Sequence, residues 1–287
     1  MTEPKQIQTV AVLGGGLMGS GIAEAAAVAG CDVILRDLDQ GAVDRAQARI
    51  EQSLARAVSA GKRTDDQTAT VRGRVTLTTE LTALAAADLV IEAVPEDVGL
   101  KTAVLRELDA IVAPDALIAS NTSSIPIAEL ARVLSNPERV LGLHFFSPVP
   151  VMGLVELVIA LDTAAPTIAA ARAFVERLGK TPIESKDRAG FIVNMLLVPY
   201  LLAAMRMFED GFASREDIDV GMKLGCGHPM GPLTLSDFIG LDVLCAVGDS
   251  LYEEFKRAEY APPPLLRRMV AAGRLGRKSG RGFYEYS

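Results

Sequence analysis

The chain has 287 residues, a net charge of −7, 49% hydrophobic residues and 23% charged residues. This composition is that of a globular protein with one large or two moderate domains, and its acidic balance argues against general nucleic-acid binding. The most apolar window, at residues 191–205, is shorter than the ~20 residues of a membrane-spanning helix. Three cysteines without a CxxC motif favour a reduced, cytoplasmic setting.

Short apolar runs alternate with amphipathic stretches over the first 185 residues. Strands are predicted at residues 9–13, 32–36, 75–78, 88–94, 116–120, 140–146 and 154–159. This alternation predicts an α/β fold with a Rossmann-like, doubly wound parallel sheet that is covered on both faces. From about Gly190 the apolar residues recur at helical spacing. We therefore expect a Rossmann-like domain at residues 1–187 and an all-helical C-terminal domain at residues 188–287.

A glycine motif stands between the first predicted strand and the helix that follows it, in the segment TVAVLGGGLMGSGIAEAAAVAG. Glycines in the order GxGxxG allow a tight turn, a close approach of the backbone to a pyrophosphate, and close packing of helix and strand. The pyrophosphate would accept hydrogen bonds at the helix N-terminus. The residues expected to form this cofactor site are Gly14, Gly16, Leu17, Met18 and Gly19.

An acidic residue, Asp37, ends the second predicted strand. A carboxylate at this place can accept hydrogen bonds from both hydroxyls of the adenosine ribose and would repel a 2′-phosphate. NAD is therefore predicted as the cofactor in preference to NADP. The neighbouring Arg36 acts in the opposite direction, because an arginine is the usual partner of a 2′-phosphate.

One of the two histidines, His144, stands in the apolar stretch LGLHFFSPVPVMGLVELV. A lone histidine in such a stretch is more often a satisfied core residue than a catalytic one. Glu156, however, follows twelve positions later in a second apolar run, where a carboxylate also needs a partner. An imidazole held by a carboxylate could serve as the base of a hydride transfer. Ser123 and Glu96 follow other predicted strands, at the edge of the sheet where ligands bind.

Several long motifs occur in one order along the chain: GGGLMGSGIA, IEAVPEDVGLK, ASNTSSIPI, HFFSPVPVM, GFIVN, MKLGCGHPMGPLTLSDFIGLD and GRKSGRGFYEY. With them the chain resembles the L-3-hydroxyacyl-CoA dehydrogenases, and among these the bacterial 3-hydroxybutyryl-CoA dehydrogenases. The resemblance covers essentially the whole sequence. It implies NAD-dependent, reversible oxidation of an (S)-3-hydroxyacyl-CoA to a 3-oxoacyl-CoA, with a short-chain acyl-CoA as substrate, and a homodimer whose helical domain caps the active site.

The resemblance also assigns roles to single residues. His144 matches the catalytic base and Glu156 its partner, while Ser123 and Asn194 match residues that hold the substrate oxygen. Cofactor-binding positions are implied for Glu96, Lys101, Ser123 and Ser147, and CoA-binding positions for Ser53 and Ser123. Two cations near Ser53, Arg56 and Lys62, could pair with CoA phosphates, but a solvated helix face explains them about as well.

Two positions depart from the family pattern HFFNPVPVMK, because Ser147 replaces its asparagine and Gly153 its lysine. A serine can still donate a hydrogen bond but has a shorter reach than an amide. We expect this exchange to weaken a contact with cofactor or substrate without abolishing turnover.

Two other functions stay open at this point. One is a dehydrogenase of the same fold that acts on a free hydroxy acid, as the gulonate and carnitine enzymes do; the CoA-side motifs argue against it. The other is a non-enzymatic NAD-binding protein of the crystallin kind. The presence of His144, Glu156, Ser123 and Asn194 together argues against it, because a structural protein has no need of all four. Cys226 and His228 are too few for a structural zinc site, so no metal is predicted. No nucleic-acid or membrane partner is predicted either.

Overall fold

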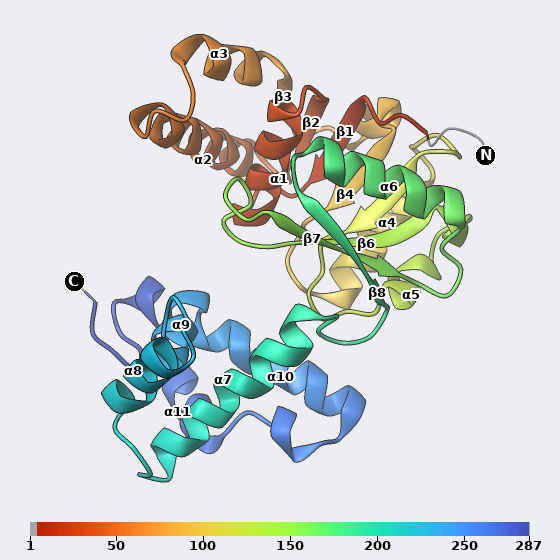
Figure 1. The fold of residues 1–287 in the computed structure, drawn as a ribbon. Helices are drawn as coiled ribbons and strands as arrows, with labels where there is room; N and C mark the ends of the chain where they lie inside the picture. Colours follow the sequence, from red (N-terminus) through yellow and green to blue (C-terminus); the bar gives the residue numbers. More distant parts are fainter. Residues whose placement is uncertain (1–4, 287) are drawn as a thin grey trace. The chain divides into compact units, whose positions relative to one another are not determined.

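A computed structural model describes residues 5–286, and the chain divides into two compact units (Figure 1). The first unit ends at Asp187 and the second begins at Arg188. Each unit has its own buried apolar core.

The first unit is built on one eight-stranded sheet with the order β3-β2-β1-β4-β5-β6-β7-β8. Its strands are β1 Thr9–Leu13, β2 Asp32–Arg36, β3 Val75–Thr78, β4 Leu89–Glu92, β5 Leu117–Ser120, β6 Val140–Phe145, β7 Leu154–Ile159 and β8 Thr181–Lys186. The strand order reverses beside β1, which lies between β2 and β4. In an open α/β sheet this reversal opens a crevice beyond the carboxyl ends of the strands, where ligands bind.

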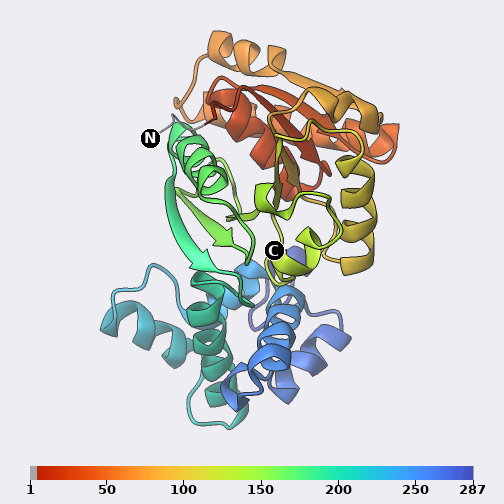
Figure 2. The same cartoon turned by 90° about the vertical axis from the view of Figure 1, so that its right-hand side faces the viewer.

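The helices of this unit cover both faces of the sheet. They are α1 Leu17–Val28, α2 Gln40–Ser59, α3 Asp65–Gly73, α4 Val98–Asp109, α5 Ile127–Ala131 and α6 Ala165–Arg177, with 3₁₀ turns at Leu81–Ala86 and Pro137–Arg139. Helices α1 and α6 share one core with the strands, to which Ile22 and Phe174 contribute. In Figure 2 the sheet stands between α6, drawn in green, and α4, drawn in olive. Strands buried on both faces explain the continuous apolar runs in the sequence.

All seven predicted strands are present, although β4, β5 and β6 are one to three residues shorter than expected. Two features of the sheet differ from the prediction. The sheet is not wholly parallel, because β6 and β7 pair in the antiparallel direction. The strand β8 was not predicted; it pairs in parallel with β7 at the edge of the sheet. The sequence of β8 does not have the pattern of a strand, because it contains Pro182 and several polar residues. A proline is tolerated in an edge strand because no neighbouring strand needs its N–H.

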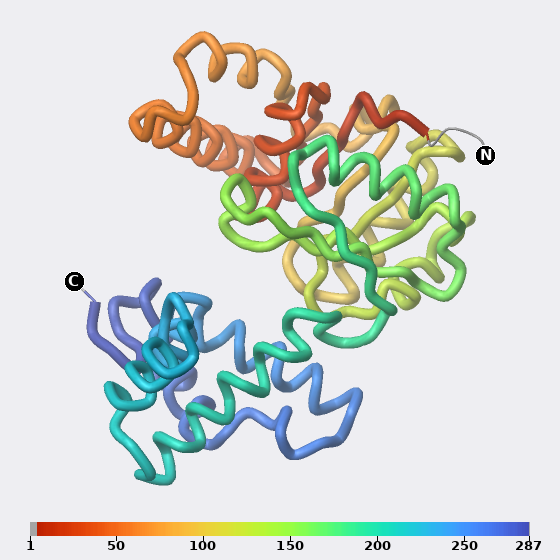
Figure 3. Tube along the Cα trace, viewed as in Figure 1, coloured from red at the N-terminus to blue at the C-terminus, as the bar shows by residue number. Residues whose placement is uncertain are grey.

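The connection between β6 and β7 spans residues 146–153 and curls towards α1, as the yellow-green trace of Figure 3 shows. A Cβ atom on Gly21 of α1 would lie 2.9 Å from Cβ of Val149 in this connection, so a glycine is needed for the close packing. Lys180, which is buried, donates hydrogen bonds to the carbonyl oxygens of Val149 (2.6 Å) and Met152 (2.7 Å). The connection is therefore held from both sides.

The second unit is helical, as predicted. It contains α7 Val193–Glu209, α8 Arg215–Gly225, α9 Pro232–Ile239, α10 Leu241–Phe255 and α11 Pro264–Ala271, with 3₁₀ turns at Ala258–Tyr260 and Arg277–Ser279. The buried carboxylate of Asp237 accepts hydrogen bonds from the backbone N–H groups of Phe283 and Tyr284, which holds the C-terminal segment onto α9. Within residues 5–286, no helix combines the length and the apolar character that crossing a membrane would require.

Candidate active site

The glycine motif forms a tight turn between β1 and α1. Gly14 has φ +99°, and a Cβ atom there would lie 2.7 Å from the carbonyl oxygen of Ala93 on the neighbouring strand. A Cβ atom on Gly19 would lie only 1.8 Å from the carbonyl oxygen of Gly14. Gly16 differs from both, because the space around its Cβ position is open to 4 Å and its φ is −64°. The first and third glycines of the motif are thus needed for the fold, whereas the second leaves an open approach to the backbone.

Helix α1 begins directly after Gly16, and no side chain caps its N-terminus. Leu17 and Met18 are its first two residues, so their backbone N–H groups have no carbonyl partner within the helix. Because Gly16 leaves room in front of these groups, the turn fits the pyrophosphate of a dinucleotide. The contacts predicted for Leu17 and Met18 themselves stay predictions.

Asp37 lies beside this turn, at the carboxyl end of β2. Its Oδ2 accepts a hydrogen bond from the backbone N–H of Gly15 (2.7 Å), and its Oδ1 accepts one from Leu38 (2.7 Å). The guanidinium of Arg36 points elsewhere, because its Nε donates to the carbonyl oxygen of Thr79 after β3 (3.0 Å). A second arginine, Arg49 of α2, donates to the carbonyl oxygen of Gly15 (3.2 Å). The sequence analysis did not single out Arg49, which stands on the polar face of an amphipathic helix.

His144 and Glu156 are direct neighbours across the antiparallel pair of β6 and β7. Nδ1 of His144 and Oε2 of Glu156 are 2.6 Å apart, and the two residues are 4% and 0% exposed. An ionised carboxylate can only accept hydrogen bonds, so Nδ1 carries the proton and Nε2 of the neutral ring accepts. The unpredicted antiparallel pairing is what brings these two residues together.

Ser123 completes a line of three polar groups. Its hydroxyl lies 2.9 Å from Nε2 of His144 and donates to it if the ring has the tautomer given above. Ser123 follows β5, whose neighbour β6 carries His144 near its carboxyl end. The structure therefore places Ser123, His144 and Glu156 in one contact chain at the edge of the sheet where a parallel α/β fold binds its ligands.

Glu96 lies on the loop after β4 and holds the turn that contains Ser123. Its Oε1 accepts hydrogen bonds from the hydroxyl of Thr122 (2.6 Å) and from the backbone N–H groups of Ser123 (3.0 Å) and Ser124 (3.1 Å). Partial burial raises the pKa of this carboxyl, but the Lys101 ammonium and these hydrogen bonds outweigh it and hold the pKa below its ordinary value. Glu96 is ionised and tied to the Ser123 turn; its predicted contact with the cofactor stays a prediction.

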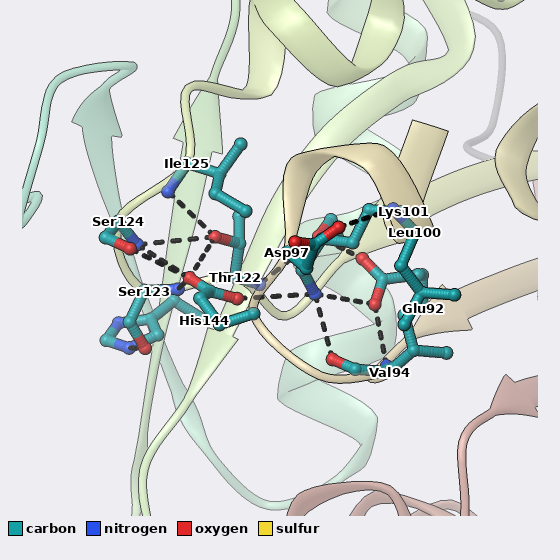
Figure 4. A network of polar contacts seen from close by, with 12 residues as sticks. Glu92, Val94, Asp97, Leu100, Lys101, Thr122, Ser123, Ser124, Ile125 and His144 are labelled. Carbon is teal, nitrogen blue, oxygen red and sulfur yellow. Dashed lines mark hydrogen bonds and ion pairs between the residues drawn. The ribbon is translucent and has the colours of Figure 1, made fainter. Parts of the chain in front are cut away.

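Lys101 of α4 is only 1% exposed, although we predicted that it contacts the cofactor. Its Nζ donates to Oε1 of Glu92 (2.7 Å) and to the carbonyl oxygen of Val94 (3.1 Å), and it lies 3.3 Å from Oε2 of Glu96. Figure 4 shows Lys101 beside Glu92 and, across the turn, Ser123 beside His144. The ammonium thus has two hydrogen-bond acceptors and a second carboxylate beside it within the protein, and a direct cofactor contact stays a prediction.

The sequence analysis missed Glu92, the last residue of β4. This side chain is fully buried in the run LVIE, and a carboxylate in an apolar run is the same signal that singled out Glu156.

A pocket of about 760 Å³ lies beside α1 and α2. Of the four residues predicted to bind CoA, Ser53, Arg56 and Lys62 line it and Ser123 does not. Ser147 lines it too, from the connection between β6 and β7. The pocket thus combines a hydroxyl and cations from α2 and its end with the carboxyl group of Glu24 on α1 and apolar side chains from the connection after β6. Its cations can pair with an anionic group of a ligand.

Asn194 belongs to the second unit, where it stands in the first turn of α7. Two residues with left-handed backbone precede this helix, Gly190 (φ +77°) and Phe191 (φ +49°). A positive φ is strained for phenylalanine, and such strain is concentrated at functional sites. The role of Asn194 towards the substrate stays a prediction.

Two family models match the chain, one for each unit. Residues 9–188 match the NAD-binding domain of 3-hydroxyacyl-CoA dehydrogenase, and residues 190–286 match the C-terminal domain of the same family. The chain belongs to the 3-hydroxyacyl-CoA dehydrogenase family. Both the resemblance inferred from the motifs and the prediction of NAD as cofactor are confirmed by these matches.

Relatives of known name match over nearly the whole chain. A 3-hydroxybutyryl-CoA dehydrogenase of Mycobacterium tuberculosis is 53% identical over 282 residues, which cover 98% of this chain and 99% of that protein. A probable 3-hydroxybutyryl-CoA dehydrogenase of Bacillus subtilis is 44% identical over 281 residues, 98% of each chain. Two crystal structures share the fold. M. tuberculosis FadB2 matches with a TM-score of 0.98 and 52% identity, over 99% of this chain and 100% of that chain. The (S)-3-hydroxybutyryl-CoA dehydrogenase PaaH1 from Ralstonia eutropha matches with a TM-score of 0.94 and 48% identity, over 98% of this chain and 100% of that chain.

Proposed function

We propose that this chain catalyses the NAD-dependent, reversible oxidation of a short-chain (S)-3-hydroxyacyl-CoA, with 3-hydroxybutyryl-CoA as its substrate, to the 3-oxoacyl-CoA. The observation that carries the proposal is the chain of contacts Ser123–His144–Glu156 within an NAD-binding unit. The names of the relatives supply the substrate class, since they are 3-hydroxybutyryl-CoA dehydrogenases over almost the full length.

The geometry assigns a step to each member of the contact chain. Nε2 of His144 is the base that takes the hydroxyl proton of the substrate, and Glu156 holds the ring tautomer and stabilises the imidazolium that forms. Ser123 lies within hydrogen-bond distance of the same Nε2, so a substrate oxygen that reaches the base also reaches the serine hydroxyl. When bound, NAD⁺ supplies the acceptor for the hydride that leaves the hydroxyl-bearing carbon.

The pocket beside α1 and α2 supports a CoA thioester as the substrate. Arg56 and Lys62 present cations that can pair with phosphates, and the hydroxyl of Ser53 can meet a polar group of the pantetheine chain. A free hydroxy acid would leave this pocket empty.

The second unit supports the other predicted roles. Large apolar side chains are exposed on this unit, Leu196 on α7, Leu224 on α8 and Phe212 between these two helices, and exposed apolar surface is typical of an interface between subunits. This surface supports the predicted homodimer. Asn194, at the start of α7, would supply the amide that helps Ser123 to hold the substrate oxygen.

The test is NADH oxidation by the purified protein with acetoacetyl-CoA, run beside NADPH and beside free acetoacetate. We expect rapid turnover with NADH and the thioester only, because Asp37 stands where a 2′-phosphate would come and Arg36 is engaged by Thr79. Turnover of free acetoacetate would contradict the CoA assignment. Turnover with NADPH would contradict the role of Asp37. NADH binding without turnover of either compound would favour the non-enzymatic alternative.

Ser147→Asn tests the departure from the family pattern. Ser147 is exposed on the CoA pocket, and a longer amide there can form a hydrogen bond that the serine cannot reach. One such bond is worth about 0.5–1.5 kcal/mol, so we expect the KM for acetoacetyl-CoA to fall about two- to tenfold. Steady-state kinetics in which acetoacetyl-CoA and NADH are varied in turn measures this change and the KM for NADH. Unchanged Michaelis constants and an unchanged kcat would contradict the interpretation of Ser147 as a weakened contact.

A further inference from the structure

The turn that carries the catalytic serine is held by a row of three charged residues, of which Glu92 and Lys101 are buried and Glu96 is partly exposed. Glu96 accepts the backbone N–H groups of Ser123 and Ser124, Lys101 lies 3.3 Å behind Glu96, and Glu92 lies behind Lys101. Each member contacts the next, so the row links the interior of β4 to the turn after β5.

Glu92 is the fixed end of this row. Its carboxylate accepts three hydrogen bonds: from the Lys101 ammonium (2.7 Å), from the Ser120 hydroxyl (2.6 Å) and from the backbone N–H of Val94 (2.7 Å). One of these donors, Ser120, belongs to β5 and is the register partner of Glu92 in the sheet, so this contact is fixed by the strand pairing. By contrast, Glu96 is on a loop, and its side chain is 41% exposed. A charge placed on a loop needs such support to keep a fixed position.

We propose that Glu92 is a positioning residue for catalysis, which holds Lys101 so that Lys101 in turn holds Glu96 against the Ser123 turn. This inference rests on the proposed function and adds a residue to its machinery. Glu92 touches neither substrate nor cofactor in this assignment.

The expected consequence of removing the Glu92 charge follows from the distances. In Glu92→Gln the buried Lys101 ammonium keeps Glu96 as its one carboxylate within 4 Å. Attraction then draws Glu96 towards Lys101 and away from the N–H groups of Ser123 and Ser124. The Ser123 hydroxyl loses its fixed position beside His144, and a displacement of about 1 Å in a catalytic group can lower the rate about a hundredfold.

The experiment compares Glu92→Gln and Lys101→Met with Asp109→Asn. The control changes another ion pair, between the half-buried Asp109 at the end of α4 and the buried Arg139 (2.6 Å), which has no contact with the Ser123 turn. Two readouts are taken: kinetics with acetoacetyl-CoA and NADH, and amide hydrogen exchange over residues 121–126 in the protein without ligands. Melting temperatures show how far each variant is destabilised.

We expect Glu92→Gln to lower kcat about 10- to 100-fold while the KM for acetoacetyl-CoA changes less than about twofold, because the row does not line the CoA pocket. Exchange over residues 121–126 should become faster in Glu92→Gln and Lys101→Met but not in Asp109→Asn. The double variant Glu92→Gln/Lys101→Met should have a kcat no lower than that of Lys101→Met alone, because both substitutions interrupt the same row of contacts.

Normal kcat in Glu92→Gln, or unchanged exchange over residues 121–126, would overturn the proposal. A loss of kcat in Asp109→Asn as large as that in Glu92→Gln would overturn it too, since general destabilisation would then explain both. If Glu92→Gln does not fold, Ser120→Ala removes one donor from Glu92 and also the acceptor of the Thr122 N–H (3.2 Å), so a kcat equal to the wild-type value would count against the proposal. If the wild-type protein reduces no acetoacetyl-CoA, the proposed function fails while the exchange experiment still decides the role of Glu92.

Discussion

His144→Gln is expected to lower kcat by about 10²–10⁴-fold, the range that a positioned general base contributes. Glutamine keeps much of the side-chain volume and can donate to Glu156, but it has no group that takes up a proton at neutral pH. The affinity for NADH should stay unchanged, because the glycine turn and Asp37 do not contact His144. Steady-state kinetics together with a fluorescence titration of NADH binding separates the two effects.

The same variant tests the pH dependence. In the wild-type protein, oxidation of 3-hydroxybutyryl-CoA should slow on acidification, because a protonated imidazole cannot accept the hydroxyl proton. In His144→Gln this acid limb should be absent from the residual activity. A mutant that keeps the wild-type acid limb would show that another group is the base, whatever its loss in kcat.

Two glycine variants should separate folding from cofactor binding. Gly19→Ala brings a methyl group to 1.8 Å from the Gly14 carbonyl oxygen, so the turn or α1 must shift. Overpacking of this kind costs about 1–3 kcal/mol or more, and we expect the melting temperature to fall by about 5 °C or more. Gly16→Ala has open space and an ordinary backbone conformation, so the melting temperature should change by less than about 1 °C.

Gly16→Ala should nevertheless weaken NADH binding about tenfold or more, because the new methyl group stands where the backbone must approach the pyrophosphate. Thermal denaturation without ligand and a titration with NADH measure the two properties independently. Undiminished NADH affinity in Gly16→Ala would mean that the dinucleotide does not pass over the second glycine. An unchanged melting temperature in Gly19→Ala would contradict the packing described for the turn.

The buried strands and the glycine turn could be predicted because each depends on local signals: apolar runs between turns, and glycines where a Cβ atom would collide. The direction of β7 could not be predicted, since an apolar run looks the same in either direction. β8 was not predicted because one face and one edge of this strand are open to solvent. Polar residues such as Glu184 and Lys186 are tolerated there, and they make the segment resemble a loop in the sequence.

The site residues show the same division. His144 and Glu156 were recognisable as two polar residues in apolar runs that could satisfy each other, and the structure brings them to 2.6 Å. The partners of Glu92 are nine and 28 residues away, on α4 and β5, and no spacing in the sequence reveals that they meet. No pattern in the sequence shows that the Lys101 ammonium meets Glu92, Val94 and Glu96 inside the protein. Such networks depend on tertiary contacts, which periodicity does not encode.

The antiparallel pairing of β6 and β7 has a consequence for how the enzyme can be altered. His144 and Glu156, the proposed base and its carboxylate, are joined by strand register, while the connection at residues 146–153 between them lines the pocket proposed for CoA. That connection can therefore be exchanged for one of another sequence or length without separating His144 from Glu156, provided that the register is kept. If the proposed roles hold, a library of variants confined to the connection is expected to change substrate preference while it keeps the His144–Glu156 pair.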